Sequence, residues 1–272
     1  MSFSNNRFTL LTFGAFALLL CAMGAAALHL SVETMFIVSV LMFVTCVSSA
    51  MHLYGVRTGL RLVVLAVGIG FFVEYMGENY GWFFGDYDFT DGLGLRLLGV
   101  PVVIPLMWFN LVHMCLVLGN IILYRTPVAP TRGVGTIIAS SVFCGMLVTA
   151  YDLGADPYMV FVAKAWIMLK TDGYWFGETL QGFVGWMTIS TVIAVLFNLL
   201  TRPTPQPAGT EPFKKVHALV PILIYGDLMV FLMMHGEPVE TRTIVLFAMG
   251  IPLLAALLTY QNWSFRSDAA AS

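Results

Sequence analysis

The chain has 272 residues, of which 59% are apolar and 10% are charged, and its net charge is −2. Soluble domains carry about 25% charged residues, so the composition excludes an ordinary soluble domain and predicts an integral membrane protein. A charge this close to zero also excludes the basic surface that binds nucleic acid.

Eight apolar runs are long enough to cross a bilayer, which takes about 20 helical residues. They cover residues 8–28, 34–54, 62–80, 100–124, 134–151, 180–200, 216–235 and 243–260. We therefore expect an all-α, polytopic membrane helix bundle of about eight transmembrane helices, in a single domain covering residues 1–272. Residues 153–179 mix charged and aromatic side chains and predict a short interfacial or re-entrant helix. The prolines and glycine of residues 202–212 predict a flexible linker.

Lysine and arginine are unevenly divided between the two sides of this arrangement. With the N-terminus inside, nine lie on the cytoplasmic side and four on the outer side. By the positive-inside rule, we expect both termini in the cytoplasm and a bacterial inner membrane as the location. Most acidic residues fall on the outer side, so we expect an acidic site to open toward the outer leaflet.

Two glutamates lie in the outer half of the third run. An ionisable side chain inside a membrane segment is costly and is by default a candidate functional site. Glu74 and Glu78 are four residues apart and share a helix face with Gly70, Gly77 and Gly81. Small residues there allow another helix or a flat ligand to approach closely. A poorly hydrated pocket disfavours the carboxylate form, and neighbouring carboxyls cannot easily both ionise. The pair is a candidate proton donor or, alternatively, a structural pair bonded to another helix.

Asp152 and Asp156 repeat this spacing at the end of the fifth run. Asp156 precedes Pro157, and proline disfavours helix at the residue before it, so we expect Asp156 to cap the helix or to form a turn. Asp152 is still within the helical run and is the better site candidate. Asp227 stands alone in the seventh run, and the sequence leaves open whether it handles protons or bonds to a hydroxyl or backbone group.

Aromatic residues crowd the same side of the predicted bundle as these acids. They include Trp82, Tyr87, Trp108, Trp175 and Trp186. Most of the aromatic residues suit a belt at the membrane interface, but aromatic faces also stabilise cations. Protonation of an isolated alkene needs an acid, aromatic faces around the resulting carbocation, and water to capture that cation.

The sequence contains no motif for a bound metal or cofactor. The acidic segment DYDFTD at residues 86–91 differs from the DDxxD motif of magnesium–diphosphate sites, and no second such segment is present. The five histidines form no HxxxH or HxxHH box, which argues against a di-iron oxygenase. The last apolar run has no lysine for a retinal Schiff base. We therefore expect no metal and no cofactor.

Two segments, FGDYDF at residues 84–89 and GVPVVIPLMW at residues 99–108, resemble the carotenoid 1′,2′-hydratase family, which includes γ-carotene and bisanhydrobacterioruberin hydratases. Further matches are Glu74 and Glu78 in an acidic third helix, Asp152 and Asp156-Pro157 in a D…DP element, and residues 173–175 and 183–186 in its tryptophan elements. Thr179 and Gly182 depart from the pattern, since they stand where we expect Pro and Asn. Glu178 consequently falls outside the matched pattern.

The resemblance implies a cofactor-free addition of water to the terminal isopropylidene double bond of a carotenoid in the bilayer, giving a tertiary alcohol. Glu78 or Glu74 would then be the acid, and Asp152 would orient or deprotonate the water. Five aromatic residues would line the substrate pocket: Trp82, Tyr87, Trp108, Trp175 and Trp186. Three alternatives stay open: a non-enzymatic carotenoid-binding protein, a small transporter, and a lyase or isomerase of another polyprenyl lipid. The location of the polar groups mainly at one side disfavours transport.

Overall fold

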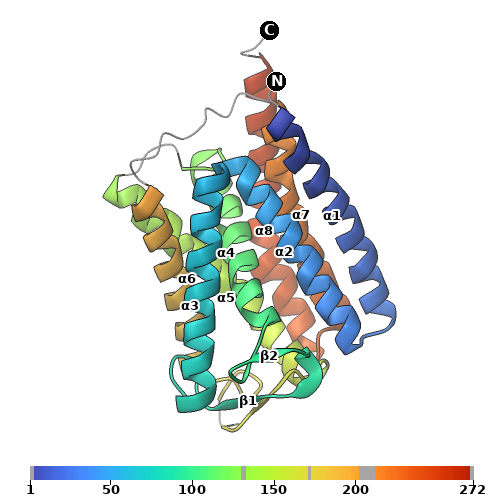
Figure 1. Cartoon of the computed structure of the whole chain (residues 1–272). Helices are drawn as coiled ribbons and strands as arrows, with labels where there is room; N and C mark the ends of the chain where they lie inside the picture. Colours follow the sequence, from blue (N-terminus) through green and yellow to red (C-terminus); the bar gives the residue numbers. More distant parts are fainter. Residues whose placement is uncertain (1–2, 130–132, 171–172, 202–211, 270–272) are drawn as a thin grey trace.

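The computed structural model describes residues 3–129, 133–170, 173–201 and 212–269. Eight helices in these ranges are long and apolar enough to span a membrane, which confirms the predicted polytopic all-α bundle. They are α1 (Phe3–Leu28), α2 (Val32–Tyr54), α3 (Val56–Tyr80), α4 (Val103–Tyr124), α5 (Val134–Phe161), α6 (Leu180–Thr201), α7 (Pro212–His235) and α8 (Glu240–Ala269). α1 begins and α8 ends at the same end of the bundle, and the short strands lie at the other end (Figure 1).

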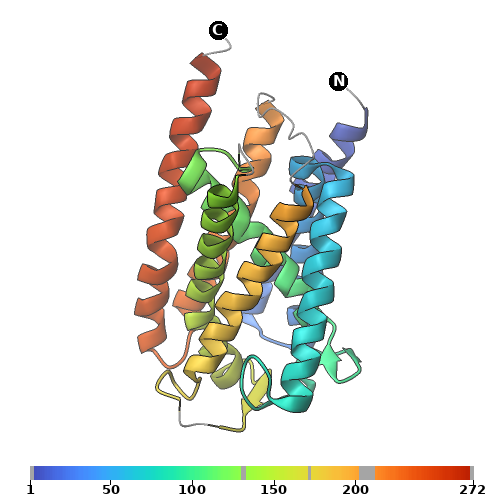
Figure 2. The ribbon, with the colours of Figure 1, turned by 90° about the vertical axis from the view of Figure 1, so that its left-hand side faces the viewer.

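α4 is the central helix of the bundle. It contacts α2, α3, α5, α6, α7 and α8. Of its apolar span 78% is buried, against 17% for that of α8. A helix that is apolar on all sides belongs in the interior, and α4 has this character. Around it, α3 and α6 lie side by side although they are distant in the sequence (Figure 2).

Several helix boundaries differ from the predicted ones, and three of these differences affect the chain near the site. α3 begins at Val56, because Gly55 alone separates it from α2. The Gly55 φ of +81° is in the region that glycine adopts without steric cost. α4 begins at Val103, because Val100–Pro101 form strand β3, which pairs with β2 (Arg96–Leu97). α5 runs on to Phe161, ten residues past its predicted end at residue 151.

The predicted interfacial or re-entrant helix in residues 153–179 is wrong for the described part of that range. α5 takes up its first part, and strand β4 (Trp166–Met168) follows. β4 pairs antiparallel with β1 (Tyr87–Phe89), which lies far earlier in the chain. We call this pair the β1–β4 ribbon. Of the predicted linker, residues 202–211 lie outside the described residues, and Pro212 begins α7.

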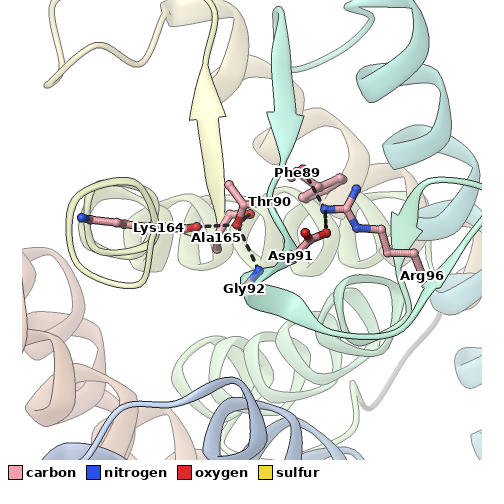
Figure 3. Close-up of polar contacts among 7 residues, drawn as sticks. All are labelled: Phe89, Thr90, Asp91, Gly92, Arg96, Lys164 and Ala165. Atoms are coloured by element: carbon pink, nitrogen blue, oxygen red, sulfur yellow. Dashed lines mark hydrogen bonds and ion pairs between the residues drawn. The ribbon is translucent and has the colours of Figure 1, made fainter.

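Hydrogen bonds hold one end of the β1–β4 ribbon closed (Figure 3). The Thr90 backbone N–H donates to the Ala165 carbonyl at 2.9 Å, and the Thr90 hydroxyl donates to the Lys164 carbonyl at 2.5 Å. Arg96 donates from Nη2 to the Phe89 carbonyl at 2.8 Å. These contacts fix the ribbon against the loop that includes the 3₁₀ turn η1 (Asp91–Leu93).

Buried histidines lie in the half of the bundle remote from the ribbon. His52, near the end of α2, stacks on His217, near the start of α7, with 3.7 Å between ring centroids. On α4, His113 Nε2 lies 3.3 Å from Ser49 Oγ. The expectation that polar groups gather mainly at one side is therefore wrong for the histidines. Among the described residues, the buried carboxyl groups do gather near the ribbon.

Candidate active site

A cavity of about 70 Å³ lies where α3, α4, α5 and α6 meet the β1–β4 ribbon. Its lining includes four acidic side chains, Glu74, Asp152, Asp156 and Glu178. All four are buried. We call it the acid-lined cavity. One water needs about 10–15 Å³, so the cavity has room for more than one water-sized group.

Aromatic side chains supply much of the remaining wall. The six are Phe84, Tyr87, Phe89, Tyr151, Trp166 and Trp186. Alternate residues of a strand face the same side, so β1 presents Tyr87 and Phe89 to the cavity, and β4 presents Trp166 and Met168. The ribbon thus closes the cavity at this end of the bundle.

Glu74 is held by two hydrogen-bond donors. The Tyr87 hydroxyl donates to Glu74 Oε2 and the Trp108 Nε1–H donates to Glu74 Oε1, each at 2.7 Å. Burial first, and then the adjacent Glu74, raise the pKa of Tyr87, so the phenol keeps its proton and remains a donor. Both carboxyl oxygens therefore act as acceptors, and their position in the cavity is fixed.

Glycines on α3 make the room for these two donors. A Cβ at Gly70 would lie 2.8 Å from Trp108 Cβ, and one at Gly77 would lie 2.7 Å from the Tyr87 hydroxyl oxygen. The sequence prediction that small residues on this face admit a close approach is confirmed. Gly81 has a different role, because its φ of +65° ends α3 in the left-handed conformation.

The other three acids form one cluster. Glu178 interacts through its side chain with both Asp152 and Asp156, and the Trp166 Nε1–H donates to Asp156 Oδ1 at 3.0 Å. Burial first, and then the charges of Asp152 and Asp156, raise the pKa of Glu178. Among the described residues no N–H or O–H group reaches Asp152 Oδ2 or Glu178 Oε2, so a bond between these carboxyls requires a proton on one of them. Neighbouring carboxyls cannot easily all ionise, which favours a proton on at least one of the three.

The prediction that Asp156 caps a helix or forms a turn is wrong. Pro157 lies inside α5 and Asp156 is buried in the cavity wall. A proline within a helix leaves the carbonyl four residues earlier without its N–H partner. That carbonyl belongs to Leu153, and the Trp175 Nε1–H donates to it at 3.0 Å. Trp175 thus replaces the bond lost at Pro157 and stabilises the turn of α5 that carries both aspartates.

This contact predicts a stability effect. Trp175→Phe removes the donor to Leu153 and is expected to lower the free energy of unfolding by about 1–3 kcal/mol. In a Pro157→Ala background the backbone gains an N–H at this position that can bond to the Leu153 carbonyl, so the same change is expected to cost clearly less. Thermal unfolding of the four proteins in detergent measures the difference. Equal losses in both backgrounds would show that Trp175 acts through packing alone.

Glu178 was the acid that the sequence pattern left aside, and Gly182 is what makes room for it. A Cβ at Gly182 would lie 2.6 Å from Glu178 Oε1. The position that departs from the family pattern is thus the one that accommodates this carboxyl. The position of Glu178 just before an apolar run identifies it as a candidate site residue, although it does not match the family motif.

Glu78 does not line the acid-lined cavity. It lies one turn further along α3, where a Cβ at Gly99 would be 2.9 Å from Glu78 Oε2. Four residues advance a helix by about 6 Å, and this is enough to bring Glu78 beside the β2–β3 hairpin. The two glutamates share a face, as expected, but only Glu74 reaches the cavity.

The five aromatic residues predicted for the pocket have different positions. Tyr87 and Trp186 line the cavity. Trp108 lies behind its wall, bonded to Glu74 and stacked on Trp186 with 4.4 Å between centroids. Trp175 and Trp82 do not line the cavity, and Trp82 is 52% exposed. In the described ranges no group of three or more His, Cys, Asp or Glu has the arrangement of a metal site.

Comparison with known proteins places this architecture in a family. The chain is 29% identical over 202 residues to the bisanhydrobacterioruberin hydratase of Haloarcula japonica, a match that covers 72% of this chain and 65% of that protein. The match therefore spans less than two thirds of the relative's length. No solved structure matches the chain. The family model described as carotenoid biosynthesis protein matches residues 12–257, and the chain belongs to this family of carotenoid biosynthesis proteins.

Proposed function

We propose that this membrane protein is a carotenoid 1′,2′-hydratase, which adds water to the terminal double bond of an acyclic carotenoid end group without a cofactor. The observation that supports this most is the acid-lined cavity, where four buried carboxyls share a small space with six aromatic side chains. Acids and aromatic faces are what the protonation of an alkene and the stabilisation of its carbocation require.

The reaction follows from the polarity of the double bond. An acid of the cluster donates a proton to the less substituted carbon, C2′, and the π electrons form the new C–H bond. The positive charge falls on the tertiary carbon, C1′, beside the aromatic wall. A water oxygen bonds to C1′ and loses a proton to a carboxylate, which leaves a tertiary alcohol. The sum is the addition of one water, and the accepted proton returns to the cluster before the next turnover.

The hydrogen bonds favour Asp152 as the acid and Glu74 as the base, the reverse of the roles inferred from the sequence. Glu74 meets two donors, an environment that suits a carboxylate. Asp152 interacts with Glu178, and this neighbouring carboxyl would supply the proton. Asp152 and Glu74 both line the acid-lined cavity, so donor and acceptor share one space. Phe84, Tyr87 and Trp186 would face the cation.

Pigment analysis in a host that makes lycopene tests the activity. Expression of the chain is expected to produce a more polar carotenoid that has gained the mass of one water. Pigment that co-purifies with the protein unaltered would support the non-enzymatic binding protein instead, and a product of another mass would point to a different reaction.

We further infer a bacterial inner membrane, with both termini in the cytoplasm and the acid-lined cavity toward the outer leaflet. α3 begins and α4 ends at the end of the bundle where α1 begins (Figure 1). Arg57 and Arg61 lie in the first turns of α3 and Arg125 directly follows α4, which supports this orientation under the positive-inside rule. A green fluorescent protein fused to the C-terminus is expected to fluoresce, as it does in the cytoplasm, and a dark but fully inserted fusion would contradict this orientation.

A further inference from the structure

A second cavity, of about 110 Å³, adjoins the acid-lined cavity. Helices α1, α2, α4, α5 and α7 and the turn η1 enclose it. Four side chains line both cavities and form a shared wall: Ile104, Met107, Tyr151 and Met159. Two of these are methionines, whose unbranched side chains adapt to irregular space. A ligand can therefore extend across the shared wall from one cavity into the other with little rearrangement of the wall side chains.

The second cavity differs from the first in its chemistry. It has no acidic or basic side chain among its lining residues. The hydroxyl of Ser39, one of its few polar groups, already donates to the Met35 carbonyl at 2.8 Å. A bound water needs two to four polar partners, and cavities without them stay dry and take up apolar ligands. Flexible methionine side chains also line this cavity on α1 and α2, namely Met23, Met35 and Met42.

The acid-lined cavity is too small to hold a whole carotenoid. At about 70 Å³ it holds a reacting end group and water, but not the long hydrocarbon that follows in a carotenoid. The hydrocarbon has to leave the acid-lined cavity across an apolar boundary. The shared wall is an apolar boundary of this kind.

We propose that the second cavity binds the isoprenoid segment that follows the reacting end of the carotenoid, with the rest of the polyene continuing toward the lipid. The ligand class rests on the proposed function, but the binding step does not depend on turnover. The segment enters past Met107 and Met159 and lies between α1, α2 and α7. This cavity would then select substrates by the shape of the segment next to the reacting end.

Two matched pairs of variants test the assignment. Ala26 lines the second cavity and its neighbour Ala25 is exposed, so Ala26→Phe fills the space and Ala25→Phe adds the same bulk outside it. On α2, Val38→Phe and Ile37→Phe form an equivalent pair, since Ile37 is also exposed. The proteins are purified in detergent without pigment and titrated with lycopene, and the bound lycopene is measured by absorbance after gel filtration.

We expect Ala26→Phe and Val38→Phe to weaken lycopene binding roughly tenfold or more, because the filled cavity has no room left. Ala25→Phe and Ile37→Phe are expected to bind like wild type. No binding by wild type, or equal binding within each pair, overturns the proposal. If only one of the two cavity variants, Ala26→Phe or Val38→Phe, folds, the comparison within that pair decides. Lycopene that binds in this pattern but is never hydrated contradicts the proposed activity and leaves the binding site standing.

Discussion

Asp152→Asn is expected to lower the rate of carotenoid hydration by about 10²–10⁴-fold, the usual contribution of a general acid. The substitution keeps the volume of the side chain but removes the carboxyl that passes the proton of the cluster to the alkene. Because Asp152 lies within α5 and its partner Glu178 remains, the bundle is expected to fold and insert. Conversion of lycopene by the purified variant, followed by chromatography, gives the rate.

A matched control comes from another carboxyl in a membrane helix. Asp227 lies on α7, is partly buried and lines neither cavity, so Asp227→Asn is expected to have a rate close to that of wild type. The sequence left its role open, and the structure gives no partner to Asp227 Oδ2 among the described residues. A normal rate for Asp152→Asn would remove this residue from the mechanism.

The second large effect is expected from Glu74→Gln, with a loss again of about 10²–10⁴-fold. Glutamine keeps an oxygen to accept from Tyr87 or Trp108, but it cannot take the proton released by the attacking water. Its amide also places an N–H against one of these donors. Glu78→Gln is the informative comparison, since the two residues lie on one helix face and only Glu74 lines the cavity.

We expect a much smaller loss for Glu78→Gln than for Glu74→Gln under the same assay. A larger loss for Glu78→Gln than for Glu74→Gln would assign the role of the base to Glu78. It would also place the reaction beside the β2–β3 hairpin. The Tyr87→Phe variant deletes one hydrogen-bond donor to Glu74 and keeps the aromatic ring. It therefore separates the positioning of the Glu74 carboxyl by this hydrogen bond from the charge of Glu74.

The apolar runs were enough to predict the eight helices, since a bilayer demands long uncharged segments whatever the tertiary structure. The glycines of α3 were also informative, because a glycine at 70 and at 77 opens one helix face, and Trp108 and Tyr87 occupy that face. In both cases the prediction depends on residues that lie close together in the sequence, within one helix.

The sequence predictions were wrong where a contact between residues distant in the sequence determined the local structure. Pro157 predicts the end of a helix, yet α5 continues because Trp175 satisfies the carbonyl of Leu153. That bond joins residues on separate elements and leaves no local pattern, so the burial of Asp156 could not be foreseen. Strands β1 and β4 are three residues each and pair across much of the chain, which explains why the ribbon and its Trp166 were missed.

The acidic cluster shows the same dependence on tertiary contacts. Asp152 was identified because it lies inside a helical run, whereas Glu178 stands just before α6 and joins the cluster only where Gly182 leaves space for its carboxyl. The meeting of three carboxyls from distant parts of the chain is a property of the folded chain alone.

The source of the new oxygen distinguishes the addition of water from an oxidative reaction. Purified wild-type protein is incubated with lycopene in H₂¹⁸O under anaerobic conditions, and the product is analysed by mass spectrometry. Cofactor-free hydration is expected to give one ¹⁸O per hydrated end group, at the same yield as in air and without any added cofactor. An oxygen taken from O₂, or a complete need for an added oxidant or reductant, would contradict it.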